Sequence, residues 1–294
     1  MNFSSVSRVF SRISLAVLRT GLRLPVTFRH VAKKLIFKSG IGAYIDESIG
    51  WPLSYPLHGC RMLGAGGRAY ATGGYEASAV QVIMDVVNPG CVCLDVGAHQ
   101  GYFTLLLSRL VGQQGHVYAF EAHPQNALLL QRNIQLNSFQ QRVTVKQIAV
   151  TDGGELTIAL YAGRGDSSTE WNIVGHDVTG QPTLEELQVP AASLDGYIQA
   201  GQPVDFVKMD IEGAEGLALA GMRNLLRNQR PTLLVEFHNS ETWAARAELL
   251  SASYDLWSLE GTQRIKIAPG DEKRAYHCLA VPKERLGIAR SHQH

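Results

Sequence analysis

The feature that most constrains the fold is an alternation of short apolar runs with stretches long enough to form helices. The apolar runs are rich in β-branched residues and read CVCLDV (91–96), HVYAFEA (116–122), VTVKQIAV (143–150), DFVKMDI (205–211) and PTLLVEF (231–237). The helix-length stretches cover 101–110, 124–137 and 214–228. Repeated β-α units predict parallel strands with helices on both faces of one sheet.

The C-terminal part departs from this alternation. Two strand-like runs near Leu256 and Leu279 are joined by a polar, charged loop instead of a helix, so we expect them to form an antiparallel hairpin. A helix over 75–87 precedes the first strand and is ended by the segment 88–90, Asn-Pro-Gly. The predicted fold class is α/β, with a doubly wound, mostly parallel, seven-stranded Rossmann-like sheet.

Residues 151–203 interrupt the alternation with polar residues and turns, and we expect an insertion beside the ligand crevice. Four residues of this insertion are candidates for substrate contact: Ser167, Ser168, Thr169 and Trp171. A polar loop is equally well explained as a lid.

The N-terminal region is basic. The first 45 residues carry eight Lys or Arg side chains and no acidic residue. Arg8, Arg12, Arg19 and Arg23 fall on one stripe of a helix, with apolar side chains on the far side. Three interpretations stay open: the helix packs on its own domain or on a sister subunit of a homo-oligomer, lies on an anionic membrane surface, or is an organelle transit peptide.

Domain boundaries are indicated by composition. Residues 51–74 mix glycine, proline and aromatic residues without a clear period, as in a connector or lid. We predict a basic helical extension and connector over 1–74, a main α/β domain over 75–284 and a tail over 285–294. Because no apolar run reaches the roughly 18 residues that span a bilayer, we expect a cytoplasmic protein, with peripheral membrane contact through the basic helix as an alternative.

Charge and cysteine usage limit the classes of partner. The formal net charge of +1 provides no global attraction to nucleic acid, and we expect no nucleic-acid partner. The four cysteines contain no CxxC pair of the kind that zinc or redox sites use. We expect them to be buried, reduced thiols.

The first chemical motif is DVGAHQGYF, residues 95–103, which runs from a strand through a tight turn into a helix. Glycine in such a turn lets the backbone approach a ligand at the carboxyl end of the strand. Gly97 and Gly101 are four residues apart and follow Asp95, which differs from the GxGxxG spacing of dinucleotide sites. A carboxylate disfavours a diphosphate, so Asp95 favours a cationic ligand such as a sulfonium amino acid.

A second motif, YAFEAHP (118–124), ends the next strand. Glu121, 26 residues after Asp95, stands at the strand tip, where a carboxylate accepts hydrogen bonds from both hydroxyls of a ribose. We therefore predict that Glu121 binds a ribose.

A third motif, VKMDIEGAE (207–215), ends a buried strand in charged residues. On a strand, Lys208, Asp210 and Glu212 point to one face, which at the carboxyl end opens on the crevice. The following strand ends in Glu236-Phe237-His238, which brings an imidazole and another carboxylate to the same edge. Clustered charges of this kind are typical of working sites and of structural ion pairs.

Together with the IAVTD stretch (148–152) and LLVEFH (233–238), these motifs resemble the FkbM-type methyltransferases, a branch of the class I methyltransferases that use S-adenosylmethionine. The resemblance covers roughly 75–282 and leaves out the basic N-terminal region. It implies that 75–284 is an S-adenosylmethionine-dependent methyltransferase domain.

The resemblance also implies a set of cofactor-binding residues: Asp95, Gly97, Ala98, Gly101, Tyr102, Glu121, Ala122, His123, Ala149 and Asp210. The turn around Gly97 would surround the methionine part, Glu121 would hold the ribose, and Ala149 would lie near the adenine. The family often has asparagine where this chain has His99.

For catalysis, the resemblance places Asp210 and Glu212 beside the transferred methyl group. We predict that one of these carboxylates is the base or orients the acceptor hydroxyl, that Lys208 lowers the local negative field, and that His238 is a second candidate base. A divalent metal on Asp210, Glu212 and Glu236 is an alternative. Because the motif lacks a dense ligand set, we predict no metal.

The predicted function is transfer of a methyl group from S-adenosylmethionine to a hydroxyl oxygen of a small molecule, sugar or lipid. Two other classes remain. A non-catalytic cofactor-binding scaffold would have no need of the charged tip at Lys208, Asp210 and Glu212. A nicotinamide-dependent oxidoreductase would show GxGxxG, which this chain lacks.

Overall fold

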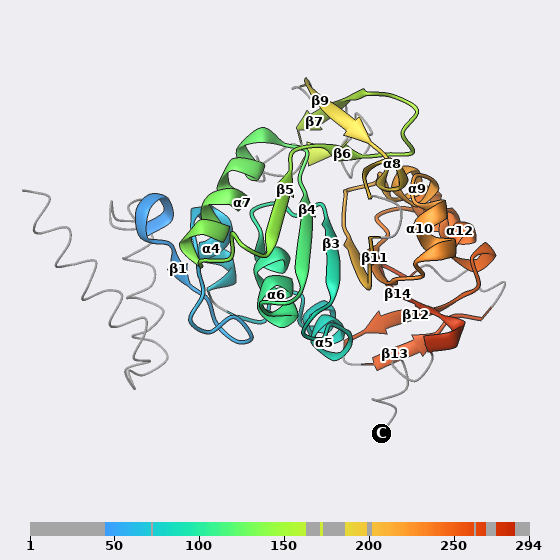
Figure 1. Ribbon diagram of the computed structural model, residues 1–294, viewed down its shortest axis with the longest axis horizontal. Helices are drawn as coiled ribbons and strands as arrows, with labels where there is room; N and C mark the ends of the chain where they lie inside the picture. Colours follow the sequence, from blue (N-terminus) through green and yellow to red (C-terminus); the bar gives the residue numbers. More distant parts are fainter. Residues whose placement is uncertain are drawn as a thin grey trace, which may run out of the picture. The chain divides into compact units, whose positions relative to one another are not determined.

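The computed structural model describes residues 45–71, 73–162, 171–172, 186–198, 202–261, 263–268 and 275–285. These residues form two compact units (Figure 1). The first contains the described residues up to Gly74 together with 132–138, and the second contains the other described residues from Tyr75 onward. The predicted basic helix lies outside the described residues.

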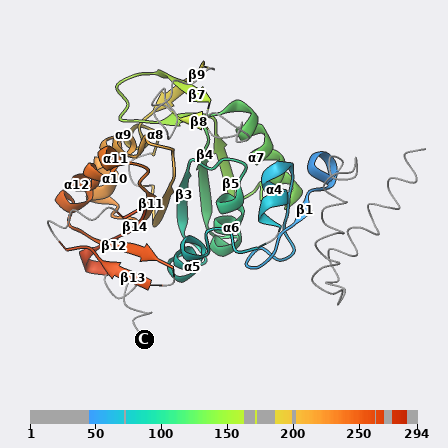
Figure 2. The same cartoon turned by 180° about the vertical axis from the view of Figure 1, so that it is seen from behind.

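The second unit is built on an eight-stranded sheet in the order β13-β12-β14-β11-β10-β3-β4-β5 (Figures 1 and 2). Five neighbouring strands are parallel: β11 (Thr232–Glu236), β10 (Phe206–Met209), β3 (Val92–Val96), β4 (His116–Phe120) and β5 (Val143–Lys146). The chain runs outward from β3 to β5 and then returns to β10 on the other side of β3. This reversal creates a switch point between β3 and β10, where ligands bind in doubly wound sheets.

Helices cover both faces of this sheet. Alternate residues of the central strands, such as Leu94, Val96 and Met209, pack in one apolar core with side chains from four helices. These helices are α9 (Glu215–Ala220), α10 (Arg223–Asn228), α11 (Ser240–Ala244) and α12 (Arg246–Ser251). The intervening residue Asp95 points to the opposite face and contacts Thr104 of α6 (Tyr102–Val111). The predicted α/β fold class is confirmed.

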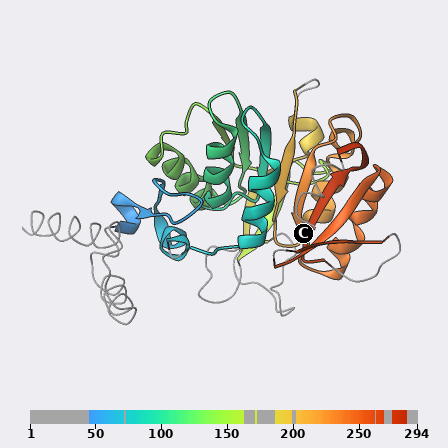
Figure 3. The same ribbon diagram turned by 90° about the horizontal axis from the view of Figure 1, so that it is seen from below.

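The number of strands differs from the prediction. β12 (Tyr254–Glu260) pairs antiparallel with β14 (His277–Pro282), as expected for the two C-terminal runs. The loop between them adds a short strand, β13 (Gln263–Lys266), on the outer side of β12. The sheet therefore has eight strands instead of seven, because a polar edge strand such as β13 lacks the apolar run that reveals a buried strand. Figure 3 shows the C-terminal part (gold to red) gathered on one side of this unit.

Two predicted helices are present, and a third is divided in two. α5 (Ala77–Val86) and α7 (Pro124–Leu136) lie within their predicted ranges. The single helix predicted over 214–228 is instead divided into α9 and α10 at Gly221. A Cβ added at Gly221 would lie 2.0 Å from the backbone oxygen of Thr151, so close packing against this backbone requires glycine there.

The expected insertion contains a second, four-stranded sheet. Its strands are β6 (Ala149–Val150), β7 (Thr157–Ala162), β8 (Trp171–Asn172) and β9 (Glu186–Ala192), in the order β6-β9-β7-β8. β6 follows the end of β5 by two residues, so this sheet joins the unit at the carboxyl end of β5 (Figures 1 and 2). A short helix, α8 (Leu194–Tyr197), leads on toward β10.

The first unit contains the segment predicted as a connector. It holds the helical turn η1 (Ile45–Ile49), the antiparallel strands β1 (Trp51–Pro52) and β2 (Arg61–Met62), and α4 (Gly64–Tyr70). Within this unit, the buried side-chain oxygen of Asn133 accepts a hydrogen bond from the amide of Leu63 at 2.7 Å. Among the described residues, no helix is long and apolar enough to cross a membrane. A last helical turn, η2, covers Lys283–Arg285.

Candidate active site

Asp95 lies near the carboxyl end of β3 and is fully buried. The hydroxyl of Thr104 donates a hydrogen bond of 2.5 Å to its Oδ2. No described residue donates a hydrogen bond to its Oδ1. Burial raises the pKa of Asp95, and the ammonium group of Lys208 opposes this rise. A buried carboxylate oxygen without a hydrogen bond is rare in folded proteins, so this atom fits a polar or cationic ligand.

The turn after β3 is shaped by contacts within the protein. Gly97 has a φ of +82°, and a Cβ added there would lie 1.8 Å from the backbone oxygen of Asp210. Gly101 has a φ of +102°, and its Cβ would lie 2.6 Å from Leu130 Cδ1. These contacts and the left-handed backbone account for both glycines. Their predicted role in letting a ligand approach stays a prediction.

The amides of this turn are also engaged. Gly97 N and Ala98 N both donate to the carbonyl of Phe120, at 3.0 and 2.9 Å. His99 has a φ of +50°, a region that Asn, Asp and His adopt more readily than other non-glycine residues. This backbone conformation gives a physical reason why asparagine and histidine both suit the position.

Glu121 follows directly after β4 and is buried. Its Oε2 accepts a hydrogen bond from the amide of His99 at 2.7 Å, and its Oε1 accepts one from the amide of His123 at 2.9 Å. Burial raises the pKa of Glu121 to about 7, although these two amides lower it. β3 and β4 are neighbours, with Val96 opposite Phe120. The two predicted cofactor carboxylates therefore stand at adjacent strand ends.

Lys208 lies between carboxylates in β10. Its ammonium group is 3.1 Å from Asp210 Oδ2 and 4.7 Å from the centre of the Phe103 ring. Lys208 is also opposite Asp95 in the β10–β3 register. Burial alone would lower the pKa of Lys208, but Asp210, Asp95 and Glu76 raise it. Lys208 is therefore charged, and its predicted role of lowering the local negative field stays a prediction.

His238 follows β11 and is surrounded by carboxylates. Its Nδ1 lies 2.9 Å from Glu215 Oε1. Its Nε2 lies 3.3 Å from Glu212 Oε2, 3.5 Å from Asp210 Oδ1 and 3.5 Å from Glu236 Oε1. Burial lowers the pKa of His238, but hydrogen bonds to Glu215 and Glu236 raise it to about 11. A protonated imidazole cannot accept a proton, so in this state Asp210 is better suited than His238 to act as a base.

Glu212 contacts His238 from a turn and not from the strand that the sequence predicts. β10 ends at Met209, so Glu212 stands in the following turn, with a φ of +52°. The predicted strand alternation therefore does not orient Glu212. Its side chain is 38% exposed, whereas that of Asp210 is 21% exposed.

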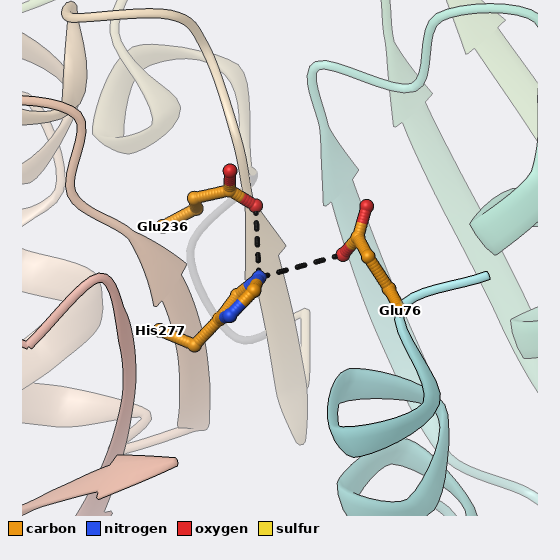
Figure 4. A group of neighbouring side chains, drawn as sticks. All are labelled: Glu76, Glu236 and His277. Carbon is orange, nitrogen blue, oxygen red and sulfur yellow. Dashed lines mark hydrogen bonds and ion pairs between the residues drawn. The ribbon is translucent and has the colours of Figure 1, made fainter. Parts of the chain in front are cut away.

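Three further charged residues of this edge were not selected from the sequence. Glu215 is fully buried and also accepts hydrogen bonds from the amides of Ile211 and Gly213, at 3.4 and 3.1 Å. Glu76 and His277 form a second group with Glu236 (Figure 4). His277 Nε2 lies 3.1 Å from Glu236 Oε2 and 3.6 Å from Glu76 Oε2. The motif ending in Glu215 offered a signal for that residue, but isolated Glu76 and His277 offered none.

The other predicted site residues differ in burial and in whether the structure describes them. Tyr102, His123 and Ala149 are buried, and the Tyr102 ring packs edge-on against Tyr75 with centroids 5.2 Å apart. Trp171 is in β8. The candidate substrate residues Ser167, Ser168 and Thr169 lie outside the described residues.

Comparison with known proteins identifies the family. Residues 95–256, more than half of the chain, match the family profile of the methyltransferase FkbM domain. The chain belongs to the FkbM methyltransferase family. This match confirms the resemblance and makes S-adenosylmethionine the expected cofactor.

A curated relative of this FkbM chain is the tRNA (adenine(58)-N(1))-methyltransferase TrmI of Thermus thermophilus, 29% identical over 154 residues. The match covers 49% of this chain and 57% of the relative, so the chain spans little more than half the length of that protein. Because the relative is named for methylation of tRNA, the prediction that no nucleic acid is a partner is wrong.

Solved structures of other methyltransferases resemble parts of this chain. The FkbM methyltransferase of Methylobacillus flagellatus is 19% identical, with a TM-score of 0.42, over 67% of this chain and 43% of that chain. An S-adenosylmethionine-dependent O-methyltransferase of Thermotoga maritima is 14% identical, with a TM-score of 0.41, over 70% of this chain and 64% of that chain.

Proposed function

We propose that this chain is an S-adenosylmethionine-dependent methyltransferase that methylates a hydroxyl oxygen of a small molecule, sugar or lipid. The observation that carries the proposal is the placement of three carboxylates at neighbouring strand ends. Asp95 and Glu121 stand at the ends of β3 and β4, and Asp210 follows β10 beside them. This edge is the switch point of the sheet, where doubly wound folds bind ligands.

The residues of β3 and β4 fit the cofactor. The unpaired Oδ1 of Asp95 is a buried acceptor suited to a cationic amino-acid group. Glu121 accepts hydrogen bonds from two backbone amides and from the side chain of Asn126, and a carboxylate has about four acceptor sites, so one remains for a ribose hydroxyl. When bound, S-adenosylmethionine supplies an electrophilic methyl group on a sulfonium centre. Tyr102, Ala122, His123 and Ala149 complete the predicted binding set.

The acceptor side needs a group that removes a proton. A hydroxyl must lose its proton as its oxygen gains the methyl carbon, because the product ether carries no charge. Burial raises the pKa of Asp210, whereas Lys208 lowers it, and a raised pKa makes a carboxylate a stronger base. We assign Asp210 to accept this proton and the more exposed Glu212 to orient the hydroxyl.

A second candidate acceptor is an adenine nitrogen of tRNA, which the match to the Thermus thermophilus enzyme favours. A ring nitrogen that attacks through its own lone pair has no proton to lose before methylation. The carboxylates at Asp210 and Glu212 would then serve only to position the base.

Two measurements test these proposals in sequence. Isothermal titration with S-adenosylhomocysteine, with NAD as the control, should show binding of the first compound only. Transfer of tritium from methyl-labelled S-adenosylmethionine is then measured on hydroxylated small molecules, sugars and lipids and, separately, on unmodified tRNA. Label on hydroxyl compounds supports the first acceptor class, and label on tRNA alone would replace it with the second. A folded protein that does not bind S-adenosylhomocysteine would refute both.

A further inference from the structure

We propose that Asp210, Glu236 and His238 form a binding site for a divalent metal ion of the Mn²⁺ type, with Glu215 as the residue that orients the histidine. One ligand atom from each of the three residues lies within 4.8 Å of the others. Among the described residues, the same criterion is met by a second group, Glu76, Glu236 and His277.

His238 has one ring nitrogen that lies close to three carboxylates at once. Its Nε2 lies 3.3 to 3.5 Å from oxygens of Asp210, Glu212 and Glu236. A single N–H can donate well to one acceptor, at about 2.9 Å. Ligand bonds of about 2.1 Å place neighbouring ligands about 3.0 Å apart in octahedral geometry and about 3.4 Å apart in tetrahedral geometry. The two distances to the proposed ligands, 3.5 Å to Asp210 and 3.5 Å to Glu236, are close to the tetrahedral spacing.

Glu215 provides an independent observation. It is fully buried, and its Oε1 holds His238 Nδ1 at 2.9 Å. No described residue bonds to its Oε2. Metal-binding histidines commonly donate their second ring nitrogen to a carboxylate, which fixes the ring with the other nitrogen facing the metal. Glu215 therefore fixes the orientation of the His238 ring, as such a carboxylate does in metal sites.

Charge also favours a cation. Four carboxylates face the imidazole of His238: Asp210, Glu212, Glu215 and Glu236. The neighbouring cations Lys208 and His277 already contact Asp210 and Glu236 from other sides. Negative charge remains in excess even when His238 is protonated. Carboxylates with one imidazole form a mixed oxygen and nitrogen donor set, which suits Mn²⁺ and related divalent ions.

The second group serves as an internal control. In Figure 4, His277 points between Glu236 and Glu76, and its Nε2 makes an ordinary hydrogen bond of 3.1 Å to Glu236. An imidazole between two carboxylates explains this group without an ion. The two groups share Glu236, which presents Oε1 to His238 and Oε2 to His277.

The location suggests what the ion would do, and only this step rests on the proposed function. Asp210 and His238 follow neighbouring parallel strands at the edge where the acceptor is expected. A divalent ion there would bind the acceptor oxygen and favour loss of its proton, and Asp210 would then act as a ligand of the ion instead of as the base assigned above. The acceptor class would then be one that chelates a cation, such as a vicinal diol.

The test is a direct metal titration of the full chain. Metal-free protein is titrated with MnCl₂, and the electron paramagnetic resonance signal of free Mn²⁺ is recorded. We expect one ion to bind. Asp210→Asn and His238→Gln should weaken binding at least about tenfold, and Glu215→Gln about 10- to 100-fold. His277→Gln keeps a hydrogen-bond donor beside Glu236 and removes no proposed ligand, so it should weaken binding less than His238→Gln does.

The outcomes separate the metal site from the enzyme. Thermal unfolding is measured on each variant without metal to confirm folding, and S-adenosylhomocysteine binding is measured on the wild type. Wild-type protein that binds S-adenosylhomocysteine but takes up no Mn²⁺ at millimolar concentration would overturn the metal site alone. Loss of Mn²⁺ in His277→Gln but not in His238→Gln would also overturn it. If His238→Gln does not fold, Asp210→Asn decides.

Discussion

At pH 8, replacing Glu121 with glutamine should raise protein stability and lower cofactor affinity. Glutamine keeps the size and one acceptor oxygen of this buried side chain but removes its charge. The pKa of Glu121 is raised by burial from its ordinary value of 4.5 to about 7. The folded state therefore binds more protons than the unfolded state between these two values, and stability falls as pH rises through that window.

The size of this effect follows from the pKa difference. At about 1.4 kcal/mol per unit, a rise of about 2.5 units costs the ionised wild type about 3 kcal/mol above pH 7. Below pH 4.5 the carboxyl group is protonated in both states and the cost disappears. Glutamine avoids this cost but leaves one of the amides of His99 and His123 without an acceptor, which costs about 1–2 kcal/mol at any pH.

Urea unfolding of both proteins at pH 4 and pH 8 measures the effect. The free energy of unfolding of Glu121→Gln, relative to wild type, should be about 3 kcal/mol higher at pH 8 than at pH 4, which means that the variant gains relative stability as the pH rises. At pH 8, S-adenosylhomocysteine should bind the variant about 10- to 100-fold more weakly, because one hydrogen bond from the ribose to a charged group is lost. A stability difference that does not change with pH would refute the burial argument. Unchanged affinity would refute the ribose assignment.

Four further predictions test other parts of the molecule. The affinity of wild type for S-adenosylhomocysteine should fall about tenfold from pH 8 to pH 6, because Glu121, with a pKa of about 7, loses its charge; a flat titration profile would contradict this. Gly97→Ala should lower the unfolding free energy by about 3–5 kcal/mol through its clash with the backbone. The control Gly90→Ala, with a similar φ but no described atom within 4 Å, should cost only about 1–2 kcal/mol in the same denaturation assay. Asp210→Asn should reduce turnover at saturating cofactor by about 10²- to 10⁴-fold, as measured by tritium transfer, and an active variant would remove Asp210 as the base. Asn133→Ala should cost about 1–3 kcal/mol in thermal unfolding because it leaves the amide of Leu63 without its acceptor, and an unchanged melting curve would argue against that bond.

The sequence was sufficient to predict the central sheet and to place Asp95 and Glu121 at one edge of it. Parallel strands that alternate with helices all end at one edge, so Asp95 and Glu121 had to lie near one another once each was placed at a strand end. The fourth and fifth parallel strands brought Asp210 and His238 to the same edge for the same reason. Strand β13 escaped detection because its side chains are largely exposed and carry no period that separates two faces.

Contacts between distant segments could not be derived in this way. His277 lies beside Glu236 only because β14 pairs with β11 in an antiparallel register that places the two residues opposite each other. Glu76 joins them from the start of α5, far away in the sequence. Gly97 illustrates the same limit, since the atom that excludes a side chain there belongs to the backbone of Asp210.

The sequence by itself therefore determined the α/β fold, the family and the carboxylates at the strand ends, because these depend on local periodicity and on motifs of a few residues. The tertiary structure decided which charged side chains contact one another. Only the packed protein shows that Glu215 holds one nitrogen of His238 while three carboxylates surround the other. The physical reason is that pKa values and ligand geometry depend on burial and on distances of a few ångströms between groups that the chain brings together only on folding.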